Sequence, residues 1–291
     1  MPRNLIFLLI LIFPSGSLLA SEIDKTRLPI GDGHISQRPE AGNVWPCQTR
    51  GFGTRREHTG PWIKTDGTFD LLNKPSAAGD VQWPSQLRIY QEGAVRKIVG
   101  NLLPNHPTGI FPKNPSDPTY VYSPNPHPIK SRAVFMELQA NPDLATNASC
   151  VPMGAIGILL SGSAIFNGLD ANGQDAVAHE IQDKCQGHPE RNGTYHYHNL
   201  TNCLKDEGVS TSHSALVGYA FDGFGIFGHR GEKGKVLSNA DLDACHGHSH
   251  IIAWDGKQAD MYHYHATWEY PYTVGCYKGK PQQLPRPSAG A

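Results

Sequence analysis

Histidine and tyrosine alternate twice in the C-terminal half of this 291-residue chain, in two stretches of identical sequence. The first Y-H-Y-H tetrapeptide spans residues 195–198 and the second spans residues 262–265. Each is preceded by a hexad D-x-C-x-G-H, at residues 183–188 and 243–248, and is followed by a cysteine. Because scarce residue types recur in the same order in both stretches, the sequence predicts an internal duplication or a pseudo-symmetric pair of units.

The alternation within each tetrapeptide predicts a β-strand, since successive side chains of a strand point to opposite faces. The two histidines of a strand then share one face, and the two tyrosines form an aromatic wall behind them. If the two strands pair or face one another, their imidazoles converge, and the histidine that ends each hexad can join them. Imidazole is the commonest metal ligand in proteins and suits Zn²⁺ and Cu²⁺. The predicted metal ligands are His188, His196, His198, His248, His263 and His265.

Four acidic residues are candidates for supporting roles at such a site. Asp183 and Asp243 of the hexads are predicted to accept hydrogen bonds from the ring nitrogens that point away from the metal. Asp222 and Glu180 are candidate general bases if the metal keeps an open position and lowers the pKa of its bound water to about 7. A metal-free alternative stays open, because alternating tyrosines and histidines can form a buried hydrogen-bond network that fixes strand register.

Three functions therefore remain open: a secreted domain that binds Zn²⁺ or Cu²⁺, an extracellular metal-dependent hydrolase or oxidase, and a metal-free structural or adhesion module. The H-G-H-S-H run at 246–250 is interpreted as a solvated loop in which only His248 is ordered, with a chelating tract as the alternative. The chain has no Walker loop, Rossmann glycine motif or G-x-S-x-G elbow, so no nucleotide cofactor is expected.

The cysteines and the first residues of the chain indicate an oxidising compartment. Residues 1–20 are typical of a secretory signal, with an arginine followed by a short apolar run. Six cysteines, an even number, then predict three disulfides. Proximity in the sequence favours the pairs Cys185–Cys203 and Cys245–Cys276, which leaves Cys47–Cys150 as the third. The protein is expected to be secreted, or periplasmic if bacterial. Three sequons are candidates for glycosylation, at Asn147, Asn192 and Asn199.

Composition excludes several classes of partner. The formal net charge is −1 and charged residues make up 18% of the chain, so no overall positive field attracts nucleic acid. After the signal is removed, no run of 18 apolar residues remains to span a membrane. The partners of the protein are not identified by its sequence.

The elements that must position these side chains are mostly short strands. Apolar runs at 132–140 and 151–166 predict core strands, and 214–228 predicts two strands around a turn at Asp222-Gly223. A short helix is expected at 175–183. The fold class is mainly β, or α+β with few short helices, in a single compact disulfide-stapled domain with long loops. The predicted divisions are a signal at 1–20, a Gly/Pro-rich β region at 21–130 packed on the rest, a main domain at 131–278 and a polar tail at 279–291.

The sequence resembles the YHYH-domain family, which is named for the tetrapeptide found here twice. The segment 213–228 resembles the family's H-S-P-L-I-G-Y-A-L-D-G-F-P-I-Y-G, and 270–276 resembles its F-P-Y-T-I-G-C ending. The likeness covers roughly residues 130–278, and it departs from the family at Ala215 and Gly225, where proline is usual. The resemblance implies a secreted or periplasmic protein of undefined activity.

Overall fold

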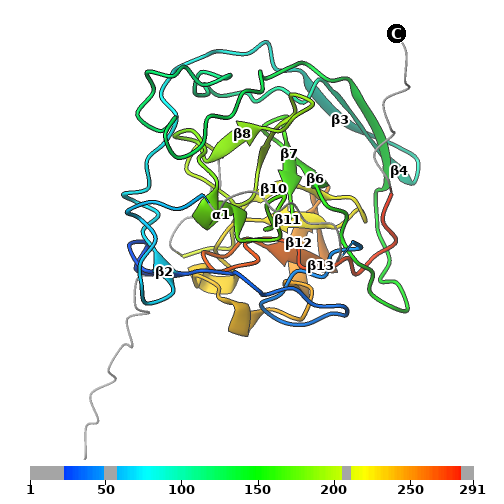
Figure 1. Cartoon of the computed structure of the whole chain (residues 1–291). Helices are drawn as coiled ribbons and strands as arrows, with labels where there is room; N and C mark the ends of the chain where they lie inside the picture. The colour runs from blue at the N-terminus through cyan, green and yellow to red at the C-terminus, as the bar shows by residue number, and fades with distance from the viewer. Residues whose placement is uncertain (1–22, 49–57, 205–210, 283–291) are drawn as a thin grey trace, which may run out of the picture.

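The computed structural model describes residues 23–48, 58–204 and 211–282, and within them the chain is mainly β (Figure 1). The described strands form an eight-stranded, a three-stranded and a two-stranded sheet. The predicted signal at 1–20 and the last part of the predicted tail lie outside the described residues. No helix in the described ranges is long and apolar enough to cross a membrane.

The eight-stranded sheet has the order β12-β13-β11-β10-β6-β7-β9-β8. Its two halves repeat one pattern: an antiparallel hairpin, a parallel neighbour that carries Y-H-Y-H, and an antiparallel outer strand that begins in the hexad. This arrangement confirms the duplicated unit expected from the sequence. The strands are β6 (Ala155–Leu159), β7 (Ala164–Phe166), β8 (Gly187–Pro189), β9 (Tyr195–Tyr197), β10 (Leu216–Ala220), β11 (Gly225–Phe227), β12 (Gly247–Trp254) and β13 (Lys257–His265).

The two halves meet where β6 pairs with β10 around a pseudo-two-fold axis. Ile158 faces Tyr219 at the centre, and each hairpin places a glycine, Gly157 or Gly218, at the equivalent flanking position. A Cβ atom on either glycine would lie 2.6 Å from a backbone oxygen of the opposite strand. The close approach of the two halves therefore requires glycine at both positions.

The other elements surround this sheet. The three-stranded sheet consists of β3 (Leu87–Glu92), β4 (Val95–Gly100) and β5 (Val134–Gln139), and the two-stranded sheet of β1 (Leu28–Pro29) and β2 (Thr68–Phe69). The helix expected at 175–183 is shorter, a single turn α1 (Ala176–His179), and two 3-10 turns occupy Glu232–Gly234 and Asn239–Asp241. Most of the described chain between these short elements is loop, in agreement with the long loops expected from the sequence.

The N-terminal region shares one hydrophobic core with the large sheet. Trp62 and Phe69 are almost fully buried in the same cluster as Ile156 and Tyr264. The Trp62 indole N–H also donates a hydrogen bond of 2.8 Å to the carbonyl of Ala178. These contacts place the N-terminal region against the loop that carries α1, while the domain boundaries given above stay a prediction.

All six cysteines are paired, and the three predicted pairings, two from sequence proximity and the third as the remaining pair, are confirmed. The bridges are Cys47–Cys150, Cys185–Cys203 and Cys245–Cys276. The last two occupy equivalent places in the two halves, because each ties a hexad to the segment that follows its Y-H-Y-H strand. Each bridge therefore closes one of the repeated units, and no thiolate is left as a metal ligand.

Candidate metal sites

Each D-x-C-x-G-H hexad forms a tight turn that its aspartate closes. The Asp183 carboxylate accepts hydrogen bonds from the backbone N–H groups of Cys185 at 2.8 Å and Gly187 at 3.3 Å. Asp243 makes the two equivalent bonds in the second hexad, at 2.8 and 3.2 Å. Short acidic side chains commonly stabilise turns in this way. The turn starts the strand that carries the hexad histidine.

The glycine of each hexad makes room for a tyrosine of the neighbouring strand. A Cβ atom on Gly187 would lie 2.3 Å from the ring of Tyr195, and one on Gly247 would lie 2.5 Å from the hydroxyl of Tyr262. Both tyrosines are buried. The aromatic wall expected behind the histidines therefore packs directly on the backbone of the hexad.

The predicted role of the hexad aspartates is wrong. Asp183 and Asp243 lie on the tyrosine face of the sheet and accept hydrogen bonds from the hydroxyls of Tyr195 at 2.9 Å and Tyr262 at 3.0 Å. Strand alternation directs the imidazoles to the opposite face, so these carboxylates cannot orient them. Burial is the main cause that raises the pKa of Asp183.

The predicted catalytic role of Asp222 is also contradicted by its position. Its carboxylate is buried on the tyrosine face, where it accepts hydrogen bonds from the Tyr264 hydroxyl at 2.6 Å and the Gly279 backbone N–H at 2.9 Å. Burial raises its pKa. Asp222 thus anchors a core tyrosine and the end of the chain, away from the imidazoles.

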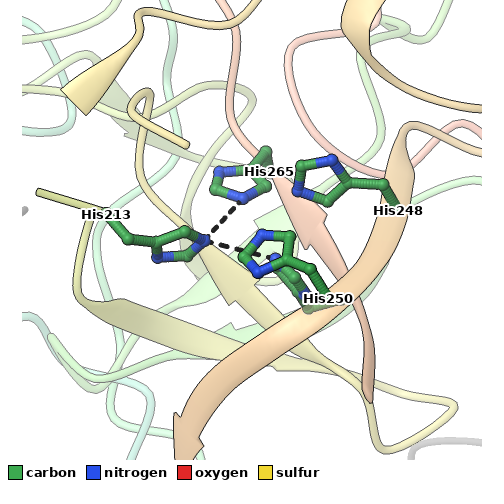
Figure 2. Close-up of side chains that lie close together, drawn as sticks. His213, His248, His250 and His265 are labelled. Atoms are coloured by element: carbon green, nitrogen blue, oxygen red, sulfur yellow. Dashed lines mark hydrogen bonds between the residues drawn. The ribbon is translucent and has the colours of Figure 1, made fainter. Parts of the chain in front are cut away.

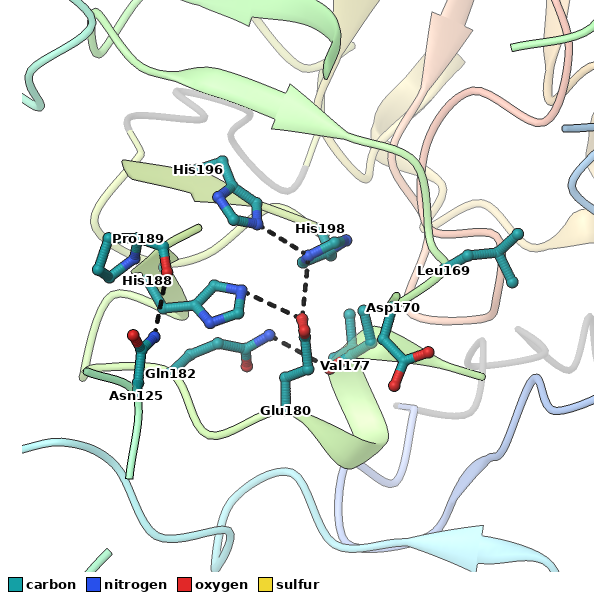
Figure 3. Close-up of polar contacts among 12 residues, drawn as sticks. Asn125, Leu169, Asp170, Val177, Glu180, Gln182, His188, Pro189, His196 and His198 are labelled. Atoms are coloured by element: carbon teal, nitrogen blue, oxygen red, sulfur yellow. Dashed lines mark hydrogen bonds and ion pairs between the residues drawn. The ribbon is translucent and has the colours of Figure 1, made fainter. Parts of the chain in front are cut away.

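The first histidine cluster, named site 1, consists of His188, His196, His198 and Glu180 (Figure 3). The Nε2 atoms of His188 and His198 each lie 3.1 Å from Oε2 of Glu180. The Nε2 atoms of His196 and His198 lie 3.2 Å apart. The three histidines are at least 93% buried, so four potential ligand atoms converge in the protein interior.

Backbone carbonyls set the orientation of two of the site 1 imidazoles. Nδ1 of His196 lies 3.1 Å from the carbonyl oxygen of Thr194, and Nδ1 of His198 lies 2.6 Å from that of Asn167. A carbonyl oxygen only accepts, so each Nδ1 must carry the proton. In the neutral ring the Nε2 lone pair then points into the cluster, which is the tautomer that a metal ligand needs.

Burial and neighbouring groups shift the pKa values of both His196 and Glu180 in site 1 downward. Burial, together with the neighbouring imidazoles, holds the pKa of His196 well below its ordinary value. Burial alone would raise the pKa of Glu180, but the charge and hydrogen bonds of His188 and His198 bring it well below its usual range. A neutral imidazole beside an ionised carboxylate is the combination that binds a cation.

Helix α1 places Glu180 in site 1, because Glu180 is the residue that follows its last turn. Asp175 caps the helix by accepting from the backbone N–H groups of Val177 at 3.0 Å and Ala178 at 3.2 Å. The Trp62 indole binds the Ala178 carbonyl at the other end. The N-terminal region thus holds the turn from which the Glu180 side chain enters the cluster.

The second cluster, named site 2, contains only imidazoles (Figure 2). The Nε2 atom of His213 lies 3.3 Å from that of His263 and 3.1 Å from that of His265. His213 comes from the segment before β10, and the others come from β12 and β13. All five potential ligand atoms lie within 4.8 Å of one another. The members of site 2 are His213, His248, His250, His263 and His265.

Site 2 uses the same orienting contacts as site 1. Nδ1 of His263 lies 3.0 Å from the Met261 carbonyl oxygen, and Nδ1 of His265 lies 2.7 Å from that of Gly228. Gly228 follows β11 as Asn167 follows β7, so the last histidine of each tetrapeptide is held at an equivalent position. Burial lowers the pKa of His263 to about 3 and holds that of His265 well below its ordinary value.

The six predicted ligands divide into two sites instead of sharing one. The strands β9 and β13 belong to opposite halves of the sheet and are separated by β11, β10, β6 and β7. The two Y-H-Y-H strands therefore cannot bring four imidazoles to one ion. Each half gathers its own tetrapeptide and hexad histidines, three in each site.

Sequence reasoning missed two members of site 2 and misjudged a third residue. His250 lies in β12, so the interpretation of 246–250 as a solvated loop is wrong, and the H-x-H spacing of His248 and His250 was the available signal. His213 reaches site 2 only through the tertiary fold. Glu180, predicted as a candidate general base, lies among the imidazoles of site 1. His246 lies outside both sites, and its Nδ1 atom is 2.9 Å from the His265 carbonyl oxygen.

The spacing of the potential ligand atoms fits a bound metal ion. With metal–nitrogen bonds of about 2.0–2.1 Å, neighbouring ligands of a tetrahedral ion lie about 3.3 Å apart. The shortest separations are 3.1–3.2 Å in site 1 and 3.1–3.3 Å in site 2, and the histidine ligand atoms of each site all lie within 4.8 Å of one another. In the third group of metal-binding residue types, His106 with Cys185 and Cys203, both sulfur atoms belong to one disulfide, so the group is not a metal site.

Two further features bear on the predicted sites. Asn147 and Asn192 are exposed, but Asn199 is 2% exposed and its amide donates a 2.6 Å hydrogen bond to Gln186, so it is a poor glycosylation site.

A cavity of about 230 Å³ is lined by residues around Lys74 and the first hexad, and its lining includes no member of either histidine cluster.

The fold and its two histidine clusters define a mainly β, disulfide-bonded protein built from two equivalent half-sheets. Residues 135–236 match the family model described as YHYH protein, and this part of the chain is a YHYH domain, as its motifs predicted. The matched range contains the first Y-H-Y-H tetrapeptide, and the second lies beyond it. No curated protein and no solved structure compared with the chain matches it.

Proposed function

We propose that this protein is a secreted metal-binding protein that holds two divalent ions, Zn²⁺ or Cu²⁺, one in each half of the duplicated sheet. Site 1 supplies three imidazoles and the Glu180 carboxylate, and site 2 supplies five imidazoles. The three disulfides support an oxidising compartment such as the extracellular space or the periplasm.

The observation that carries this proposal is the meeting of Nε2 atoms whose rings already donate through Nδ1. His263 and His265 both donate Nδ1–H to carbonyl oxygens, yet the Nε2 atom of each lies within 3.3 Å of Nε2 of His213. A neutral imidazole has one donor and one acceptor, so these rings turn lone pairs toward the cluster. Lone pairs that point at one another repel. A hydrogen bond could relieve only part of this repulsion, because a ring that already donates through Nδ1 can add only one further proton, at Nε2.

A cation is the group that satisfies several converging lone pairs at once. Protonating the rings instead is opposed by burial, which holds the pKa of His263 at about 3. The same reasoning applies to site 1, where His196 and His198 both donate through Nδ1 and their Nε2 atoms lie 3.2 Å apart. The repetition of this arrangement in both halves supports metal binding at two sites.

The test is the metal content of the purified mature protein, measured by mass spectrometry after chelation and after reloading with Zn²⁺ or Cu²⁺. We expect two equivalents in the wild type and one equivalent in each of two double variants, His196→Gln/His198→Gln and His263→Gln/His265→Gln. His34→Gln, an exposed histidine outside both sites, is the matched control and should retain two equivalents.

A second measurement covers variants that fold poorly. Chelation should lower the melting temperature of the wild type, because a ligand that binds only the folded state stabilises it by about 2.7 kcal/mol at a hundredfold excess over Kd. If the wild type takes up neither ion and its melting temperature does not change when chelator is added, the clusters are metal-free networks and the proposal is wrong.

A further inference from the structure

The two sites occupy equivalent positions but have different ligand sets. Glu180 enters site 1 from α1, whereas the imidazoles of His213 and His250 enter site 2. His250 lies two residues beyond the hexad histidine of its half, and the equivalent residue of the first half is Glu190. The Glu190 carboxylate caps its own turn by accepting from the Asn192 N–H at 2.7 Å. The duplication has thus diverged at the ligands themselves.

We propose that the two halves bind different metals, Zn²⁺ in site 1 and Cu²⁺ in site 2. This inference rests on the function proposed above. Zn²⁺ prefers four tetrahedral ligands and accepts a mixture of imidazole and carboxylate, which is the content of site 1. Cu²⁺ prefers a tetragonal set of nitrogen ligands and binds them more tightly than Zn²⁺ does. Five imidazoles exceed what Zn²⁺ uses and suit Cu²⁺.

The individual contacts of site 2 agree with a larger coordination number. Nε2 of His213 already has two imidazole neighbours, and the Nε2 atoms of His248 and His250 are buried without a hydrogen-bond partner. The ring centroids of His248 and His250 lie 4.6 Å apart, and each lies 4.6–4.8 Å from that of His263. Figure 2 shows the rings of His213, His248, His250 and His265 turned toward the same space. The two unpartnered nitrogens are the additional ligands that four-coordinate Zn²⁺ does not require.

Site 2 is also more exposed to solvent than site 1. In site 1 the ring of Phe166 stacks on His196 with centroids 3.7 Å apart, and every imidazole is buried. In site 2, His248 and His250 are half-buried on β12, the outermost strand of the sheet. A copper ion in site 2 is therefore more accessible to external ligands than a zinc ion in site 1.

The experiment loads apo-protein with two equivalents of Zn²⁺, adds one equivalent of Cu²⁺, and measures both bound metals together with the electron paramagnetic resonance spectrum. We expect one equivalent of zinc to be displaced and a copper spectrum with nitrogen couplings only. His250→Gln should weaken copper binding by more than about tenfold, since loss of even an outer partner of a ligand costs 10–100-fold. Glu180→Gln should weaken zinc retention and leave the copper spectrum unchanged.

Ser249→Ala is the matched control on the same strand, because Ser249 is exposed between His248 and His250. It should behave as the wild type. Copper distributed over both sites, seen as two overlapping copper spectra, or a copper spectrum that changes in Glu180→Gln and not in His250→Gln, would overturn the assignment and leave two-site metal binding intact. Failure of the wild type to bind either metal would instead remove the proposed function.

Discussion

The two hexad aspartates look identical in the sequence, but the structure predicts different consequences for the substitutions Asp183→Asn and Asp243→Asn. Asp183 is 2% exposed and accepts from four donors, of which the Gly109 N–H at 2.9 Å comes from a distant segment. Asp243 accepts through Oδ1 from its turn and from Tyr262, while its other oxygen faces the Lys278 ammonium at 3.2 Å.

The loss of stability in each variant depends on what the second carboxylate oxygen of the aspartate contacts. In Asp183→Asn an amide N–H₂ must face the buried Gly109 N–H, so one charge-assisted hydrogen bond of about 1.5–3 kcal/mol is lost and a donor is left without a partner. Relief of a buried charge offsets part of this, and we expect a net loss of about 2 kcal/mol. In Asp243→Asn only the half-exposed ion pair with Lys278 is lost, which is worth about 0.5 kcal/mol.

Urea and thermal denaturation of both variants, with chelator present so that metal does not contribute, tests this difference. At about 2–4 °C per kcal/mol for a domain of this size, Asp183→Asn should melt about 4–8 °C lower and Asp243→Asn about 1–2 °C lower than the wild type. Equal losses, or a larger loss for Asp243→Asn, would refute the reasoning that the link to Gly109 distinguishes the two turns.

Three other predictions concern stability and modification. Burial lowers the pKa of His179, but its hydrogen bond to Asp32 and a second one to a carbonyl raise it to about 9; the pair therefore stabilises the fold fully below about pH 6.5 and loses this contribution as the pH rises through 9. Because Asp32 is 40% exposed, this pH-dependent stabilisation is about 1 kcal/mol. Denaturation of chelator-treated protein at several pH values between 6 and 10 should show it in the wild type and not in Asp32→Asn. Replacing Cys185 and Cys203 by serine should cost about 3 kcal/mol, as for a loop of this length, and should reduce metal uptake by site 1 while site 2 stays loaded; loss at both sites would contradict independent halves. In a eukaryotic secretory host, peptide mass spectrometry should find glycan at the two exposed sequons and an unmodified Asn199, and a fully glycosylated Asn199 would contradict its burial.

The sequence determined the local features of this protein because each depends on near neighbours along the chain. Strand alternation places His196 and His198 on one face and their tyrosines on the other, whatever lies beside the strand. The duplicated hexads and tetrapeptides predicted two equivalent units, and cysteine proximity predicted two of the disulfides, which left the third pair by elimination. The mainly β fold class followed from short apolar runs separated by glycine and proline.

The tertiary structure decided which of these local faces meet. The central pairing of β6 with β10 sends the two Y-H-Y-H strands to opposite halves, so their histidines lie in two clusters and not in the shared site that the sequence left open. The tertiary fold also brought His213 and Glu180, which lie outside the tetrapeptides and hexads, among the imidazoles. Alternation fixes the direction of a side chain but not its neighbours, because long-range strand pairing depends on how the whole core packs. For the same reason Asp183 and Asp243 bind tyrosines and turns, although the sequence suggested that they support a metal.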